Sequence, residues 1–198
     1  FSGASHKVSE TESAFSSSGV KERKSIRDIR VAAVVDEFTS ACFSPEMRLL
    51  PLTLDNWEEI FEENEVDLLL VESAWSGFKS SWKGIIPYAG RTENAEILRA
   101  LKDLAGRHGV PAVFWSKEDP PDYEVFRPAA SFFDYIFTSD ANMIPRYSRD
   151  LGRSQVYDLP FCAQPAIHNP EGKTEEPGKN LLFAGTWYKR HRDRFLDY

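Results

Sequence analysis

The chain has 198 residues, with 24 Lys and Arg against 31 Asp and Glu, and a formal net charge of −7. Hydrophobic residues make up 41% and charged residues 28%, which is typical of a globular protein and excludes a wholly disordered or fibrous chain. The acidic balance argues against a nucleic-acid partner, because binding to phosphates needs a positive field.

No apolar run approaches the ~20 residues that a membrane-spanning helix needs, so no membrane span is expected. The only two cysteines, Cys42 and Cys162, are too few for a disulfide framework or a zinc quartet. We therefore expect a reducing, cytoplasmic location, either free or peripheral at the inner face of the membrane.

Short apolar runs rich in β-branched residues alternate with amphipathic segments along the chain. Residues 29–35 and 66–71 are each followed by acidic residues and are typical of buried parallel strands. Further strands are predicted at 48–53, 110–115, 133–138 and 155–159.

Helices are predicted between several of these strands. One covers 55–64, with Asp55 as its N-cap and Glu58 at the capping-box position. A second begins at Thr92 or Asn94 and ends at the glycines 106 and 109, and a third covers 141–151. This alternation predicts an α/β fold, a Rossmann-like parallel sheet with right-handed crossovers and helices on both faces.

Composition divides the chain into four parts. Residues 1–28 are polar and predict a flexible tail or linker, and residues 29–168 form the α/β domain. Residues 169–179 are rich in Pro, Gly, Glu and Lys, as linkers are. Residues 180–198 begin with a new apolar strand and predict the start of a second, truncated domain.

Polar and acidic residues follow the predicted strands of the α/β domain. In an open parallel sheet, ligands bind outside the carboxyl ends of the strands, so these residues are expected along one rim. A single polar strand end is common, but the recurrence favours a site. The substrate-binding candidates are Asp36, Glu72, Lys117 and Asp140.

Glu118 and Asp119 are the candidates for a general base, because a positioned carboxylate can accept the proton of a hydroxyl group. The two prolines that follow them stiffen the backbone. A helix N-cap or a salt bridge with Lys117 is the alternative explanation for these two carboxylates.

Trp75 and Trp82 lie in a loop that is rich in Gly, Ser and Lys. Aromatic faces beside carboxylates suit sugar rings, which stack on the aromatic ring while their hydroxyl groups bind the acids. Core packing is the commonest role of Trp and is the alternative here, whereas Trp115 is expected in the core.

Several familiar signatures do not occur in the sequence. There is no Gly-x-Gly-x-x-Gly, no Walker loop and no Gly-x-Ser-x-Gly, and the four histidines lack metal-ligand spacing. No metal or cofactor is therefore expected. A basic run near the end includes Arg190 and Arg192, which could meet a ligand phosphate or pair with the acidic rim.

Four ordered motifs resemble the amino-terminal half of the CgeB-like (spore-maturation) glycosyltransferases, and a fifth resembles the opening of that family's carboxy-terminal domain. The motifs are Val71–Trp75, Phe114–Pro121, Phe133–Asp140, Leu159–Phe161 and Leu182–Gly185 with Tyr188 and Arg192.

The resemblance implies a GT-B fold, in which two Rossmann-like domains face each other across a cleft. The amino-terminal domain would bind the acceptor, a glycan or cell-surface polymer, and the second domain would bind the nucleotide-sugar donor, with Arg190 and Arg192 near its phosphates. The activity implied is bacterial polysaccharide biosynthesis without a metal, and this stretch alone would be inactive. The Gly-rich loop that many GT-B enzymes carry after the first strand is replaced here by Asp36–Thr39.

Two other functions remain open from the sequence. One is a non-catalytic regulatory module of flavodoxin-like shape, because receiver domains also carry acidic residues after their first strand. However, such domains need a phosphorylatable Asp after the third strand and a Lys after the fifth. The other is a sugar-binding protein without transfer activity.

Overall fold

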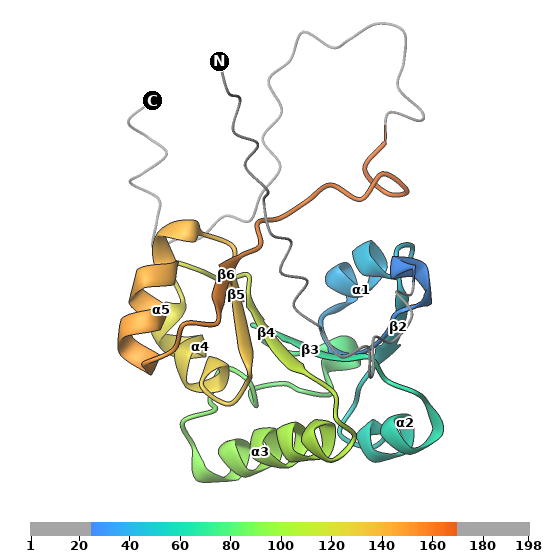
Figure 1. Cartoon of the computed structure of the whole chain (residues 1–198), viewed down its shortest axis with the longest axis horizontal. Helices are drawn as coiled ribbons and strands as arrows, with labels where there is room; N and C mark the ends of the chain where they lie inside the picture. The colour runs from blue at the N-terminus through green and yellow to red at the C-terminus, as the bar shows by residue number, and fades with distance from the viewer. Residues whose placement is uncertain (1–24, 170–198) are drawn as a thin grey trace, which may run out of the picture. The chain divides into compact units, whose positions relative to one another are not determined.

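A computed structural model describes residues 25–169 of the chain. Its six strands form one parallel sheet in the order β2-β1-β3-β4-β5-β6 (Figure 1). The predicted α/β parallel sheet is thereby confirmed. The strands are β1 (Arg30–Val34), β2 (Arg48–Pro51), β3 (Leu68–Glu72), β4 (Ala112–Ser116), β5 (Tyr135–Thr138) and β6 (Val156–Asp158).

Within residues 25–169, five α-helices and three short 3-10 helices connect or precede the strands. The α-helices are α1 (Glu37–Phe43), α2 (Trp57–Glu63), α3 (Thr92–Arg107), α4 (Tyr123–Ala130) and α5 (Ile144–Leu151). The 3-10 helices are η1 (Ile26–Asp28), η2 (Phe78–Ser80) and η3 (Ala141–Met143).

The two faces of the sheet carry different layers of helices. Side chains of α2, α3, α4 and α5 pack on one face in a core that includes Phe61, Leu98, Phe126 and Tyr147. The other face is covered by α1, whose Phe43 packs against a smaller core with Val113 and Trp115. Figure 1 shows α1 on one side of the sheet and α2 and α3 on the other.

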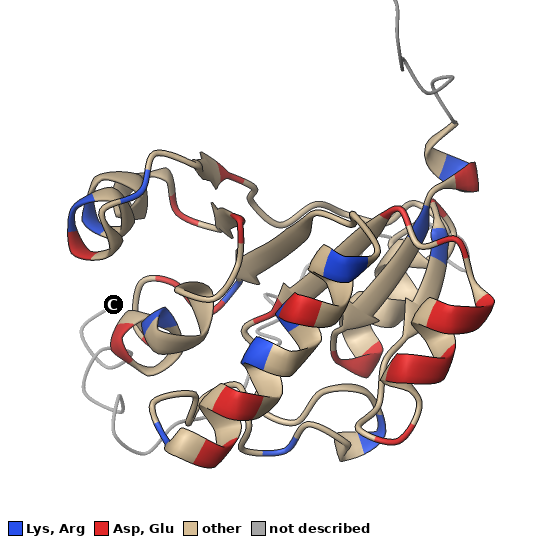
Figure 2. Cartoon of the chain, turned by 60° about the horizontal axis from the view of Figure 1, so that its bottom comes forward, with Lys and Arg blue, Asp and Glu red and all other residues tan. Residues whose placement is uncertain are grey.

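Charged residues are frequent along α2 and α3 (Figure 2), and most of them are exposed. The buried positions of α3 include Leu98, Leu101 and Leu104 at helical spacing. This amphipathic pattern is the reason the segment forms a helix against the sheet.

Two helices were not predicted from the sequence. The helix α1 has only seven residues, and α4 contains Pro128, a residue that normally argues against a helix interior. Packing against the sheet stabilises both helices, because Cys42 of α1 and Phe126 and Ala129 of α4 are buried.

The predicted start of α2 was wrong by one residue. Asn56, not Asp55, is the N-cap residue, and its side chain makes no capping bond to the helix. Its Oδ1 atom instead accepts a hydrogen bond from the Thr53 N–H at 2.7 Å. At α3, Thr92 begins the helix, while the Asn94 side chain donates to the carbonyl oxygens of Gly84 and Tyr88.

The chain divides after Gln164 into two units, and all six strands lie in the first. Of the predicted tail 1–28, the structure describes only the last four residues. The predicted linker at 169–179 and the second domain at 180–198 lie outside the described residues, apart from Asn169, so these boundaries stay predictions. Between Ser25 and Asn169, no helix combines the length and the apolar character that a membrane crossing requires.

Candidate active site

The sheet has a topological switch point between β1 and β3. From β1 the chain crosses to β2 on one side, whereas β3 lies on the other side of β1. Ligands of open α/β sheets bind in the crevice outside the carboxyl ends of such strands. Three of the predicted residues lie here, since Asp36 follows β1, Glu72 ends β3 and Lys117 follows β4.

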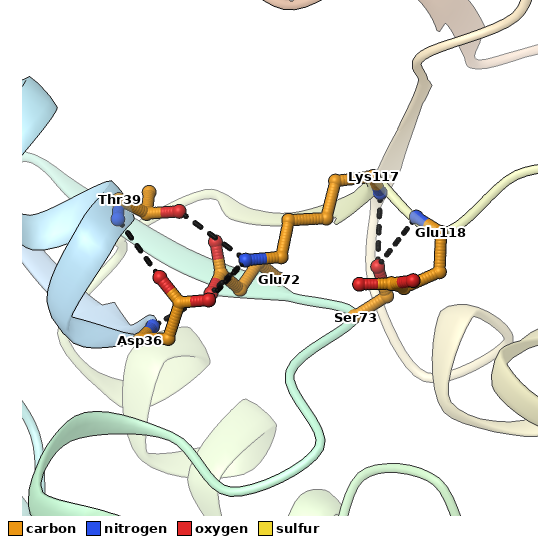
Figure 3. Close-up of polar contacts among 6 residues, drawn as sticks. All are labelled: Asp36, Thr39, Glu72, Ser73, Lys117 and Glu118. Atoms are coloured by element: carbon orange, nitrogen blue, oxygen red, sulfur yellow. Dashed lines mark hydrogen bonds and ion pairs between the residues drawn. The ribbon is translucent and has the colours of Figure 1, made fainter. Parts of the chain in front are cut away.

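The side chain of Lys117 reaches across this edge and joins the two carboxylates (Figure 3). Its Nζ atom forms an ion pair with Asp36 Oδ2 and lies 3.0 Å from Glu72 Oε1. The Thr39 hydroxyl lies 3.5 Å from the same Nζ atom. We call these four residues, Asp36, Thr39, Glu72 and Lys117, the lysine cluster.

Backbone groups complete the lysine cluster. The Asp36 N–H donates to Glu72 Oε1 at 2.6 Å, and the Thr39 N–H donates to Asp36 Oδ1 at 2.8 Å. Asp36 is thereby the N-cap residue of α1. The cluster ties the start of α1 to the ends of β3 and β4.

Burial and charge act in opposite directions on the three ionisable groups. Burial raises the pKa of Glu72, and the positive charge of Lys117 offsets only part of this rise. Burial also acts on Asp36, but its hydrogen bonds to Lys117 and Thr39 prevail and lower its pKa. Burial favours neutral Lys117, yet the two carboxylates outweigh it and raise the pKa of the ammonium group.

Glu72 has no exposed surface, and its Oε2 atom has no hydrogen-bond partner among the described residues. A buried oxygen without a partner costs less when the carboxyl group is neutral. This agrees with the raised pKa of Glu72.

Glu118 lies beside the lysine cluster and is held through its backbone. The Ser73 hydroxyl oxygen accepts hydrogen bonds from the Lys117 N–H at 2.9 Å and from the Glu118 N–H at 3.2 Å (Figure 3). Burial raises the pKa of the Glu118 carboxyl group, while the charge of Lys117 and a hydrogen bond from Trp75 lower it in part. Glu118 is neither a helix N-cap nor a salt-bridge partner of Lys117, whose ion pairs are with Asp36 and Glu72.

Asp119 uses its carboxylate inside the fold. Its Oδ2 atom accepts a hydrogen bond from the Thr138 hydroxyl at 2.7 Å, and its Oδ1 atom accepts one from the Tyr147 hydroxyl at 3.3 Å. Burial raises the pKa of Asp119, and the hydrogen bond from Thr138 opposes that rise. Tyr147 is fully buried, so this bond fastens the end of β4 to α5.

Asp140 lies at the end of β5 and caps η3. Its Oδ1 atom accepts from the Asn142 N–H at 2.9 Å, and its own N–H donates to the Thr138 hydroxyl at 3.2 Å. Thr138 therefore links Asp140 to Asp119.

The two tryptophans that were predicted to stack on a ligand differ in exposure. Trp75 is 45% exposed, and its ring packs edge-on against Phe126 with centroids 5.1 Å apart. Trp82 is fully buried, and its Nε1–H donates to the Leu52 carbonyl oxygen at 2.8 Å. The expectation that Trp82 faces a ligand was therefore wrong, because its ring belongs to the core. Trp115 is buried, as expected.

Sequence reasoning missed the hydroxyl groups that hold this edge, namely those of Thr39, Ser73, Thr138 and Tyr147. A signal existed for Thr39, since Asp36 three residues before it is the spacing of an N-cap. Nothing in the local sequence marks Tyr147, which reaches Asp119 from a distant helix.

A hollow lies at the opposite, amino-terminal edge of the sheet, between β1, β2 and the end of α2. Its charged groups pair with one another, for example Arg30 Nη1 with Glu65 Oε2 at 3.1 Å and Arg48 with Asp28 at 3.9 Å. We favour the carboxyl edge as the site, because Glu72 there is the one carboxylate between Ser25 and Asn169 that is buried with an oxygen lacking a partner.

Arg190 and Arg192, the predicted donor-phosphate residues, lie outside the described residues. Within residues 25–169, no three His, Cys, Asp or Glu side chains come together as ligands for a metal ion. The position between Asp36 and Glu72 is taken by the ammonium group of Lys117.

Comparison with known proteins gives no relative for this chain. No family model matches it, and neither a curated protein nor a solved structure matches it.

Proposed function

We propose that this chain carries the acceptor-binding side of a GT-B glycosyltransferase. In the whole protein, a sugar would pass from a nucleotide-sugar donor to a hydroxyl group of a glycan or cell-surface polymer. The observation that carries the proposal is the pairing of Glu118, whose pKa is raised, with the half-exposed ring of Trp75 at the carboxyl ends of β4 and β3, beside the switch point.

The position of the family-like motifs supports this proposal. Val71–Trp75, Phe114–Pro121, Phe133–Asp140 and Leu159–Phe161 include or follow the carboxyl ends of β3, β4, β5 and β6, respectively. Motifs that are far apart in the sequence therefore share one edge of the sheet, where an acceptor would bind.

In the proposed reaction, Trp75 stacks against an acceptor sugar ring and Glu118 accepts the proton of the attacking hydroxyl group. The acceptor oxygen forms a bond to the anomeric carbon of the donor, and the bond from that carbon to the diphosphate breaks. The nucleoside diphosphate leaves with the electron pair, and the proton remains on Glu118. This scheme uses no metal ion.

The remaining candidates receive different roles. Asp119 is a positioning residue, because both of its carboxylate oxygens accept hydrogen bonds from within the fold. Lys117, with 9% of its side chain exposed, and the buried Glu72 stabilise this edge of the sheet through their ion pair. Asp36, with 34% of its side chain exposed, can reach a ligand hydroxyl. Asp140 stays a candidate for acceptor binding, and Arg190 and Arg192 stay candidates for the donor phosphates.

The proposal includes a cytoplasmic enzyme of bacterial polysaccharide synthesis, whose second domain supplies the donor site. The test is transfer from a panel of nucleotide sugars to glycan acceptors by the whole protein, with Glu118→Gln as the variant. Transfer should be lost in Glu118→Gln and retained in Glu124→Gln, because Glu124 lies on the surface of α4, paired with Arg127 and Arg146. Unchanged transfer in Glu118→Gln would refute the assignment of the base.

A second candidate function is a non-catalytic, flavodoxin-like regulatory or sugar-binding module. The strand order β2-β1-β3-β4-β5 favours it, because flavodoxin-like domains share this order. Against a receiver-type module, β3 ends in Glu72, and the lysine follows β4 rather than β5. Magnesium-dependent binding of beryllofluoride would support that module, and sugar binding without any transfer would support the sugar-binding one.

A further inference from the structure

A small apolar cavity of about 80 Å³ lies beside the lysine cluster, between α1 and the segment that follows β6. We call it the α1 cavity. Its walls include Thr39, Cys42 and Phe43 of α1, Trp115 of β4, and Phe161 and Cys162.

Three aromatic rings form much of this wall. The ring of Trp115 stacks on Phe43 with centroids 5.7 Å apart and meets Phe161 at 5.6 Å. The indole N–H of Trp115 donates to the Leu159 carbonyl oxygen at 3.0 Å, so its polar atom is already satisfied. The cavity therefore offers apolar surface rather than hydrogen-bonding groups.

The two sides of the α1 cavity are fastened to each other. Gln164, at the end of the segment after β6, donates through Nε2 to the Cys42 carbonyl oxygen at 2.8 Å and to Glu46 Oε1 at 3.1 Å. These bonds hold the segment against α1. The cavity is accordingly a preformed feature of the fold, which lowers the cost of filling it.

Thr39 is shared between the α1 cavity and the lysine cluster. Its hydroxyl lies 3.5 Å from Lys117 Nζ, and its side chain also lines the cavity. A ligand that lies over Asp36 could thus place a small substituent into the cavity while its hydroxyl groups remain at the acidic edge.

The size and chemistry of the α1 cavity restrict that substituent. A water molecule takes about 30 Å³ of the liquid, so the cavity has room for roughly two or three heavy atoms. A hydroxyl or ammonium group would lose its hydration here without gaining a partner, whereas a methyl group loses nothing. The methyl group of an acetyl substituent meets both conditions, provided that the carbonyl and N–H groups of the acetamido group stay outside the cavity, at the polar edge beside Thr39.

We infer that the α1 cavity receives the methyl end of the acetyl group of an acetamido sugar, which makes the acceptor an N-acetylated glycan. This inference rests on the proposed function, because it names the substrate class of the same edge. The cavity acts as a specificity pocket, since the hydroxyl group that replaces the acetamido group in an ordinary hexose leaves it empty.

The test compares two probes, N,N′-diacetylchitobiose and cellobiose, which differ only in the acetamido groups. Binding to the chain is measured by calorimetry or by NMR titration. We expect the acetylated probe to bind about tenfold more tightly or better, the lower end of what a small apolar pocket achieves. Equal affinities of the two probes would overturn the inference while leaving the proposed function intact. Binding of neither probe would count against the proposed function itself, and the inference would fall with it.

Two variants check that the α1 cavity causes the preference. Cys42→Leu fills the cavity and should remove the difference between the probes, whereas Ala41→Leu adds a leucine at the next, exposed position and should preserve it. Phe161 is 60% exposed, so Phe161→Ala opens the wall with little risk to folding and should shift the preference toward N-propanoyl groups. An unchanged preference in both Cys42→Leu and Phe161→Ala, each folded by circular dichroism, would overturn the inference.

Discussion

The Nζ atom of Lys117 lies 3.0 Å from Oε1 of Glu72, a carboxylate with no exposed surface. Lys117 follows β4 and Glu72 ends β3, so this contact joins two strand ends that are 45 residues apart. Lys117 also forms an ion pair with a second carboxylate, that of Asp36, which follows β1 and caps α1. One ammonium group thus holds the ends of three neighbouring strands together at the switch point.

We predict that Lys117→Met destabilises the protein by about 3–5 kcal/mol, because it leaves a buried carboxylate without its counter-charge. Chemical denaturation measures the change. Glu65→Gln is the matched control, since it breaks the pair with Arg30 where Glu65 is 85% exposed, and its effect should be small. The double variant Lys117→Met/Glu72→Gln should recover part of the loss. A cost for Lys117→Met no larger than that of the control would contradict the structural role of the cluster.

The stability should depend on pH through Glu72 with a defined sign. Burial raises its folded-state pKa above the ordinary value of 4.5, so the folded protein binds this proton more tightly than the unfolded chain. The contribution is complete below that ordinary value and is lost as the pH rises through the folded-state pKa. As the pH rises from 4.5 through the folded-state pKa of Glu72, the wild type should therefore lose stability relative to Glu72→Gln. Chemical denaturation at a series of pH values measures this loss.

Asp36 provides the internal contrast, because its folded-state pKa lies below the ordinary value of 3.8. Its contribution is present above that value and is lost as the pH falls through the folded-state pKa. Asp36→Asn should therefore flatten the acid side of the stability curve and leave the Glu72 window in place. If Glu72→Gln and Asp36→Asn showed the same dependence of stability on pH, the signs assigned to the two groups would be refuted.

Trp75→Ala and Trp82→Ala should separate binding from stability. Trp82 is fully buried, so Trp82→Ala should cost about 3–5 kcal/mol in the free energy of unfolding. Trp75 is 45% exposed, so Trp75→Ala should cost much less but weaken binding of N,N′-diacetylchitobiose by about tenfold, as expected when a stacking ring is lost. Calorimetry and denaturation provide the two readouts. Full binding in Trp75→Ala would exclude this ring as the stacking surface.

The pH profile of sugar transfer by the whole protein should carry the signature of Glu118. Burial raises its pKa above 4.5, so the acid limb of the profile should lie above that value, since the base must be deprotonated to act. In Glu118→Gln, kcat should fall by about 10²–10⁴-fold, and the remaining activity should lose this limb. An acid limb that survives in Glu118→Gln would assign the base elsewhere.

Asp119→Asn should behave differently from Glu118→Gln. It weakens the hydrogen bonds from Thr138 and Tyr147, so it should destabilise the fold by about 1–3 kcal/mol and lower kcat while the acid limb persists. Tyr147→Phe removes one of these bonds and should reproduce a smaller part of the same effect. If the acid limb were lost in Asp119→Asn and retained in Glu118→Gln, Asp119 would be the general base and Glu118 the positioning residue.

The sequence by itself determined the strands and the edge where the candidate residues lie. Short apolar runs such as residues 29–35 and 66–71, each followed by acidic residues, favour buried strands, and parallel pairing then puts their polar ends on one side. It did not reveal α1 or α4. The helix α1 has the same length as α2 but no apolar stripe, since Phe38 is exposed while Thr39 and Ser40 are buried, and α4 contains Pro128. Such helices depend on packing against the sheet.

Only the tertiary structure decided what each residue at that edge does. Trp75 and Trp82 look alike in the sequence, yet one is half exposed and the other is in the core, because burial depends on the elements that pack around the loop. Glu118 and Asp119 are neighbours, but the Thr138 and Tyr147 hydroxyl groups donate to Asp119 rather than to Glu118. Lys117 pairs with Asp36 and Glu72 rather than with the acids beside it, because the adjacent parallel strands β1, β3 and β4 bring these two carboxylates to its side chain.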